Sequence, residues 1–249
     1  MRRFYHPDIL TPNSEFTLSA GTYHHWVKVL RAKAGDSAVL FHDGAETLVT
    51  LIDITKSSAE VRSLELTHIT RANEFTVELG LVMSRGDRMD YALQKATELG
   101  VSRIQLLLSE RCEVKLGTAA RTAKKISHFE QVVISACEQS GLNLVPEILP
   151  PITLKEYCDS FTNQATQLLL APSDTDLELP QINFKHPLQV IIGAEGGLSD
   201  HEIELCLESG ATSWSLGPRV LRCETAPVVA LALLQSAYHG SMNRGTGIL

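Results

Sequence analysis

The chain has 249 residues, of which 44% are hydrophobic and 20% charged, and its formal charge at pH 7 is −7. These values are typical of a folded globular chain with one large or two small domains and exclude intrinsic disorder. The longest apolar run, residues 226–234, is too short for a membrane-spanning helix, which needs roughly 20 residues. We therefore expect no membrane partner. The opening MRRFYHPDIL has no apolar signal core, which favours a cytoplasmic location.

The first 70 residues are predicted to form a small β-barrel or sheet. The runs DSAVLFHDG, AETLVTLIDI and SAEVRSLEL are β-branched or alternate in polarity, and turn sequences separate them. One short helix is expected at YHHWVKVLR, with Trp26, Val29 and Leu30 on one face. The polar stretch THITRANE at residues 67–74 then marks a boundary, so we expect domains at residues 1–70 and 74–249.

From Phe75 onward the pattern alternates between strands and helices, which indicates an α/β fold with a parallel sheet. FTVELGLVM and RIQLLLS are predicted strands. Between them DRMDYALQKATELG is a predicted helix with an apolar stripe that ends at Gly100. A long helix follows, GTAARTAKKISHFEQVVISACEQSG. Residues 111–125 hold five basic side chains and one acidic one, which suits phosphate contact, although a solvated helix face explains the run as well.

Three further apolar runs, ATQLLLA, LQVIIG and TSWSLG, are typical of buried parallel strands. The second continues into IIGAEGGLSDHE, where Gly193, Gly196 and Gly197 precede a capping box of Ser199 and Glu202. A glycine-rich loop between a buried strand and a helix lets a ligand approach bare backbone. The loop lacks the pattern of a phosphate-binding or dinucleotide-binding loop. It indicates a small-molecule site, or alternatively a tight turn without a ligand.

The third run continues into LGPRVLRCETAP, a loop that holds Arg219, Arg222 and Glu224 ahead of an apolar helix at residues 226–238. Taken alone, the loop favours a simple helix entry that places Glu224 near the positive end of the helix dipole.

Other chemistries lack support in the sequence. The five cysteines are odd in number and contain no C-x-x-C pair, so neither a disulfide framework nor a zinc site is indicated, and we expect no metal. A G-x-S-x-G nucleophile elbow is missing, and His201-Glu202 has no second histidine at the zinc-protease spacing. Nucleophilic hydrolysis is therefore not indicated.

Four blocks, DRMDYALQKATELGVSRIQLLLSERCE, ISACEQSG, IGAEGGLSDHEIE and LGPRVLRCETA, occur in an order and at spacings that resemble the ribosomal RNA small subunit methyltransferase E family. The resemblance extends to YHPD and HHWVKVLRAKAGD near the N-terminus and so involves nearly the whole chain. It implies a C-terminal SPOUT-type domain with a deep trefoil knot and a parallel sheet, preceded by a small PUA-like β-barrel that binds RNA. It also implies a homodimer that methylates N3 of uridine 1498 in the 16S rRNA of the small ribosomal subunit.

By the same resemblance, the methyl donor S-adenosylmethionine lies among three loops. The matching residues are Leu169, Leu170, Ala171, Pro172, Gly193, Glu195, Gly196, Gly197, Leu216, Gly217, Val220, Leu221, Arg222, Thr225 and Ala226. All three loops follow predicted strands, which is where ligands bind in α/β sheets.

Methylation at uracil N3 requires loss of the N3 proton, and negative charge then spreads over the neighbouring carbonyl oxygens. Arg219 and Arg222 are candidates to stabilise that charge. Glu195 and Glu224 are candidates to take the proton, directly or through water, and the sequence does not choose between them.

Candidate contacts to RNA phosphates are the basic residues of the predicted barrel and of the basic stretch. They are Arg2, Arg3, Lys28, Arg31, Arg111, Lys115, Arg121, Lys124 and Lys125. The chain departs from the family pattern at Ala194, where the family has Pro, and at Leu142, where it commonly has Arg. Leu142 puts in doubt any RNA contact made by that arginine. The alternative functions are a non-catalytic RNA-binding or ribosome-binding module, and an unrelated nucleotide-binding α/β enzyme.

Overall fold

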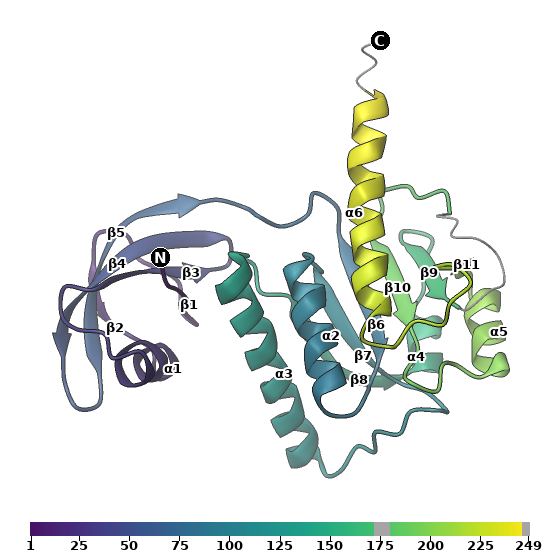
Figure 1. The fold of residues 1–249 in the computed structure, drawn as a ribbon, viewed down its shortest axis with the longest axis horizontal. Coiled ribbons are helices and arrows are strands. Elements are labelled where there is room, and N and C mark those ends of the chain that lie inside the picture. Colours follow the sequence, from purple (N-terminus) through teal and green to yellow (C-terminus); the bar gives the residue numbers. More distant parts are fainter. Residues whose placement is uncertain (172–179, 246–249) are drawn as a thin grey trace. The chain divides into compact units, whose positions relative to one another are not determined.

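The computed structural model describes residues 1–171 and 180–245, with side chains as far as residue 242 (Figure 1). It divides into two compact units. The first comprises Met1–Ala72 and Ile134–Val145, and the second comprises Asn73–Val133 and Pro146–Leu249. The sequence pattern did not predict that residues 134–145 belong with the first unit. Among the described residues, no helix is both long and apolar enough to cross a membrane.

The first unit is built on a five-stranded sheet in the order β1-β3-β4-β5-β2. Its strands are β1 (Arg3–Tyr5), β2 (Glu15–Thr17), β3 (Ser37–His42), β4 (Ala45–Ile54) and β5 (Ala59–His68). The three predicted strands are confirmed as β3, β4 and β5, which form an antiparallel meander. β1 pairs parallel to β3 and β2 antiparallel to β5. Alternate residues of the meander, among them Leu40, Val49 and Val61, form the core together with Trp26.

The predicted short helix is present but differs in form, which changes its buried face. It begins as α1 (Ala20–Tyr23) and continues as the π-helix η1 (His24–Val29). Trp26 and Val27 are buried, whereas Val29 is 57% exposed. Assigning Val29 to the buried face was therefore wrong, because a π-helix has more residues per turn than the α-helix that the spacing assumed.

The second unit has a six-stranded, fully parallel sheet in the order β11-β9-β10-β6-β7-β8. Its strands are β6 (Val77–Val82), β7 (Arg103–Leu108), β8 (Glu147–Thr153), β9 (Thr166–Leu170), β10 (Leu188–Ile192) and β11 (Thr212–Trp214). The predicted α/β class and parallel sheet are confirmed. Because β10 lies between β9 and β6, segments distant in sequence end at the same edge of the sheet.

The described part of the second unit also contains α2 (Asp87–Glu98), α4 (Leu154–Asp159), α5 (Asp200–Glu208) and α6 (Ala226–Gly245), while α3 (Ala119–Ser140) begins in the second unit and ends in the first. α4 and α5 pack on one face through a cluster that includes Leu107, Leu169 and Ile191. α2 and α6 are neighbours (Figure 1). α2 ends as predicted, since Gly100 has φ +74°, a conformation that glycine adopts at low cost.

A buried carboxylate ties the first unit together. Glu46 lies on β4 and accepts hydrogen bonds at 2.8 Å from both Arg3 and Arg71. Both guanidinium groups also donate to the carbonyl oxygen of Gly141. The hydrogen bond from Arg71, which outweighs the opposing effect of burial, and a further one from Arg3 hold the pKa of Glu46 below its ordinary value. Glu46 is therefore an anion that connects the strands to the returning segment.

We expect Glu46→Gln to lower the free energy of unfolding by about 2 kcal/mol at pH 7, because it leaves two guanidinium groups without a charged partner. The measurement is urea unfolding followed by Trp26 fluorescence in a Trp214→Phe background. Because the folded pKa is depressed, the stabilisation is present above the ordinary pKa of 4.5 and is lost as the pH falls through the folded value. The difference between the two proteins should therefore vanish in acid.

The matched control is Glu15→Gln in the same sheet. Glu15 pairs with Arg62 at 2.7 Å, but the side chains are 52% and 62% exposed. An exposed pair contributes only about 0–1 kcal/mol. Equal losses for the two variants, or a Glu46→Gln effect that persists at low pH, would contradict the account.

Candidate functional site

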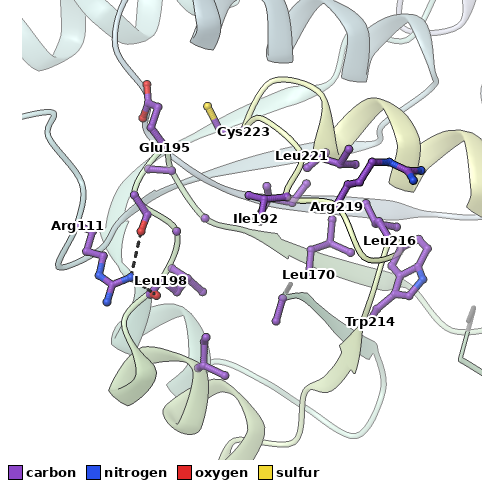
Figure 2. A pocket seen from close by; sticks show the side chains of 18 of the residues that line it. Arg111, Leu170, Ile192, Glu195, Leu198, Trp214, Leu216, Arg219, Leu221 and Cys223 are labelled. Carbon is purple, nitrogen blue, oxygen red and sulfur yellow. Dashed lines mark hydrogen bonds between the residues drawn. The ribbon is translucent and has the colours of Figure 1, made fainter. Parts of the chain in front are cut away.

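A cavity of about 410 Å³ lies at the carboxyl edge of the parallel sheet of the second unit. The end of β9, the loop after β10 and the loop between β11 and α6 form its walls (Figure 2). The sequence-predicted residues that line it are Leu170, Ala171, Gly193, Glu195, Gly196, Gly197, Leu216, Gly217, Arg219, Val220, Leu221 and Ala226. Three loops separated along the chain therefore meet as expected.

Several predicted residues are not part of the lining. Leu169 is fully buried in β9, and Arg222 is exposed to solvent. Glu224 and Thr225 are half-buried beside the cavity. Pro172 lies outside the described residues.

The sequence did not predict the other lining residues as part of this site: Arg111, Ile192, Ala194, Leu198, Ile203, Trp214 and Cys223. Ala194, Leu198 and Cys223 each lie next to a predicted residue, so proximity along the chain was the signal that could have found them. Arg111 had no such signal, because it comes from the segment after β7.

The glycine loop is both a tight turn and a wall of the cavity. The amide of Gly197 donates to the carbonyl oxygen of Ala194 at 2.9 Å, and Gly197 has φ +66°. A Cβ at Gly193 would lie 3.1 Å from the backbone carbon of Gly197, which is tighter than ordinary van der Waals contact. Gly197 and Gly217 also line the cavity, and nothing lies within 4 Å of a Cβ position on either. The loop therefore offers bare backbone to a ligand.

The predicted capping box at the start of α5 is confirmed, and its glutamate has a second role. The side chain of Ser199 accepts from the amide of Glu202, and the Glu202 carboxylate accepts from the amide of Ser199 at 2.9 Å. Glu202 is buried and also accepts from the amide of Glu110 at 2.8 Å. One carboxylate thus joins the start of α5 to the segment after β7.

Arg111 holds the same loop from that segment. Its Nη1 donates to the carbonyl oxygens of Gly196 and Leu198, both at 3.1 Å (Figure 2). Two charge-assisted hydrogen bonds to one loop fix its backbone conformation. The structure therefore gives Arg111 a part in the cavity wall that its sequence context did not suggest.

One end of the cavity is polar. Figure 2 shows Glu195 and Cys223 near each other there, while Arg219 lies at the other side. Glu195 pairs with Arg88 of α2 at 3.0 Å. Burial raises the pKa of Glu195, but hydrogen bonds from its own backbone amide and from Arg88 outweigh burial, and the net pKa is lowered.

Cys223 connects this end to two other residues. Ser84, after β6, donates to the Cys223 thiol at 3.3 Å, and the thiol donates to the Glu224 carboxylate at 3.2 Å. Burial is the largest cause of the raised pKa of Cys223, so the thiol keeps its proton and acts as a donor. No group of three or more metal-ligating side chains occurs among residues 1–171 and 180–242.

The cavity fits a small organic ligand with both an apolar and a polar part. Leu170, Ile192 and Leu221 supply apolar surface, and the glycine loop supplies unhindered backbone. A volume of about 410 Å³ is within the usual range for small-molecule sites, ~300–1,000 Å³. The arrangement suits binding and orienting a ligand rather than nucleophilic attack, since the described lining offers only the protonated thiol of Cys223 as a nucleophile.

The predicted phosphate contacts separate into two groups. Arg3 differs from the others, because its side chain is only 15% exposed and its guanidinium group is bound by Glu46. Lys125 is half-buried. The exposed residues are Arg2, Lys28, Arg31, Arg111, Lys115, Arg121 and Lys124. Leu142, which replaces the family's arginine, is buried in the first unit.

Comparison with known proteins agrees with this geometry. Residues 71–235 match the model of an RNA methyltransferase domain, and residues 18–62 match that of an RNA methyltransferase PUA domain. The chain is thus an RNA methyltransferase by its domain match.

Closer relatives define the family. A ribosomal RNA small subunit methyltransferase E from Buchnera aphidicola is 34% identical, and the match covers 94% of this chain and 95% of the relative. The crystal structure of a Neisseria gonorrhoeae protein of that name, bound to S-adenosyl methionine, is 34% identical with a TM-score of 0.87, covering 95% of this chain and 98% of that one. A methyltransferase from Legionella pneumophila with the cofactor SAM bound is 35% identical with a TM-score of 0.86, covering 94% and 97%.

The chain belongs to the ribosomal RNA small subunit methyltransferase E family, as its four sequence blocks indicated.

We expect Arg111→Met to raise amide hydrogen exchange in residues 192–198 by about tenfold or more, because two charge-assisted hydrogen bonds that close the loop are lost. The control is Lys155→Met, which removes an exposed pair with Asp159 of α4. The control should leave exchange in the loop unchanged. Unchanged exchange in Arg111→Met would show that the loop does not depend on this side chain.

Proposed function

We propose that this protein transfers a methyl group from S-adenosylmethionine to N3 of uridine 1498 in 16S rRNA of the small ribosomal subunit. The observation that carries the proposal is the convergence of the three family loops on one cavity. Family membership supplies the donor and the substrate class, since a relative at 34% identity is bound to S-adenosyl methionine. The proposed setting is the cytoplasm.

S-adenosylmethionine, when bound, supplies a methyl group already activated by its sulfonium centre. The chain must therefore bind the donor, orient the acceptor nitrogen and exclude water. The apolar wall and the bare glycine backbone would hold the donor at Leu170, Gly193–Gly197 and Leu216–Ala226. Arg219 at the rim and exposed Arg222 would stabilise negative charge on the uracil oxygens.

The proposed architecture has a PUA-like barrel at residues 1–70 that binds RNA, and a SPOUT domain with a trefoil knot at residues 74–249. The PUA-domain match at residues 18–62 supports the first part. The placement of β10 between β9 and β6 supports the second, because a strand late in the chain is inserted beside the first strand of the sheet. We also propose a homodimer. Support comes from α6, where Val228, Val229 and Leu233 remain half-exposed apolar side chains.

The function is tested with labelled S-adenosylmethionine on small ribosomal subunits and on naked 16S rRNA, both from a strain that lacks the modification. We expect N3-methyluridine at the single site, mapped by mass spectrometry. Absence of transfer to either substrate, with the donor still bound, would favour a non-catalytic RNA-binding or ribosome-binding module.

RNA binding is tested by charge reversal at Lys124 and Lys125, in the N-terminal half of α3. If both contact phosphates, Lys124→Glu with Lys125→Glu should weaken binding and reduce the slope of log affinity against log salt by about 1–2. The control is Lys155→Glu, at an exposed side chain of α4. An unchanged slope in the double variant would remove this surface from the RNA interface.

A further inference from the structure

The proposed reaction needs a proton acceptor, and the structure distinguishes between the two available carboxylates. Uracil N3 carries a proton in its neutral form, so a base within hydrogen-bond reach accelerates methylation at neutral pH. Glu195 lines the cavity in the loop after β10, and Glu224 follows the lining residue Cys223 in the loop after β11. This inference rests on the proposed function and concerns which of them takes the proton.

Glu195 already has strong hydrogen-bond donors. Its Oε1 accepts from Nη1 of Arg88 at 3.0 Å, and its own backbone amide and that of Arg85 favour the carboxylate form. The Glu195 side chain is 27% exposed, so these contacts are partly shielded from water. Because protonation would have to break the ion pair with Arg88, Glu195 is a poor proton acceptor. The pair instead ties the glycine loop to the first turn of α2.

Glu224 has weaker donors. Its side chain is only 16% exposed, and its nearest donor is the Cys223 thiol at 3.2 Å. A thiol is a weak hydrogen-bond donor. Arg222 lies 3.9 Å away with a side chain that is 78% exposed, so water screens its effect. The thiol therefore orients the Glu224 carboxylate, and no close cation shielded from water compensates its negative charge.

Cys223 provides that orientation. Its thiol lines the cavity, receives a hydrogen bond from buried Ser84, and donates to Glu224. The chain Ser84, Cys223, Glu224 thus runs from the carboxyl end of β6 into the loop before α6. Because β6 is an interior strand, these hydrogen bonds hold the Glu224 carboxylate in a fixed position relative to the sheet.

We propose that Glu224 is the general base, that Cys223 is its positioning residue, and that Glu195 with Arg88 anchors the glycine loop. The N3–H bond breaks, its proton goes to a carboxylate oxygen of Glu224, and the electron pair stays on N3. That pair forms the new bond to the methyl carbon as the carbon–sulfur bond of the donor breaks and its electrons remain on sulfur. Glu224 then releases the proton to solvent.

The charged and titratable groups around Glu224 come from three segments. Arg222 and Cys223 are its neighbours in the loop, Glu195 comes from the loop after β10, and Arg88 from α2. The hydrogen bond with Glu195, followed by the negative charges of Glu195 and Glu224, raises the pKa of Arg88. With the base present, the methylation rate should reach a plateau at neutral pH. Without the base, the rate should instead keep rising with pH until uracil itself ionises.

The test is single-turnover methylation by Glu224→Gln at saturating S-adenosylmethionine, on small subunits reconstituted with transcribed 16S rRNA. We expect a loss of about 100-fold or more, with the affinity for the donor, measured by calorimetry, changed less than about twofold. Replacing uridine by 5-fluorouridine makes N3–H more acidic. This substrate should restore the variant by about tenfold relative to wild type, because proton removal has become easier.

Glu195→Gln is the matched control. It should weaken donor binding and raise exchange in residues 192–198, while 5-fluorouridine gives it no selective rescue. Cys223→Ser should keep most activity because a hydroxyl also donates, and Cys223→Ala should lower the rate with a shifted pH profile. Selective rescue of Glu195→Gln, or wild-type turnover by Glu224→Gln, would overturn the assignment. If wild-type protein transfers no methyl group, the proposed function fails instead.

Discussion

The functional part of this protein depends on the parallel pairing of β10 with β9 on one side and β6 on the other. This pairing brings the end of β9, the glycine loop and, through β11, the loop before α6 to one edge of the sheet. Ligands in open α/β sheets bind at carboxyl edges for the same reason. The cavity is thus a consequence of strand order, and the loop residues determine what it binds.

A second level of organisation keeps the loops in place. The glycine loop is held from one side by Arg111 and from the other by the pair of Glu195 with Arg88. Glu202 adds a contact between the start of α5 and the segment after β7. The glycines of the loop expose backbone but contribute no side-chain packing. These long-range polar contacts stabilise the loop instead. A backbone surface fixed before the ligand arrives lowers the ordering cost of binding.

The sequence predicted features that depend on neighbouring residues, but it did not predict individual contacts between residues far apart in the chain. The capping box of Ser199 and Glu202 spans three residues, and the apolar runs of β9, β10 and β11 are contiguous, so each was readable. The strand β8 was not predicted because it contains Pro150 and Pro151, and it is tolerated because it lies at the sheet edge.

Contacts between distant residues had no local signature. Arg111 with Gly196 and Arg88 with Glu195 are 85 and 107 residues apart, and only the fold pairs them. Arg3 looked like a free cation because its partner Glu46 lies on another strand. Even the choice between Glu195 and Glu224 needed the three-dimensional surroundings of each carboxylate.

The central claim is that the three strand-end loops form one site for the methyl donor. The most direct measurement is hydrogen exchange of the full chain with and without saturating S-adenosylmethionine. The account predicts slower exchange at residues 192–198 and 214–226 together, with little change in Met1–Ala72. Protection confined to one of these loops, or appearing instead in the first unit, would contradict it.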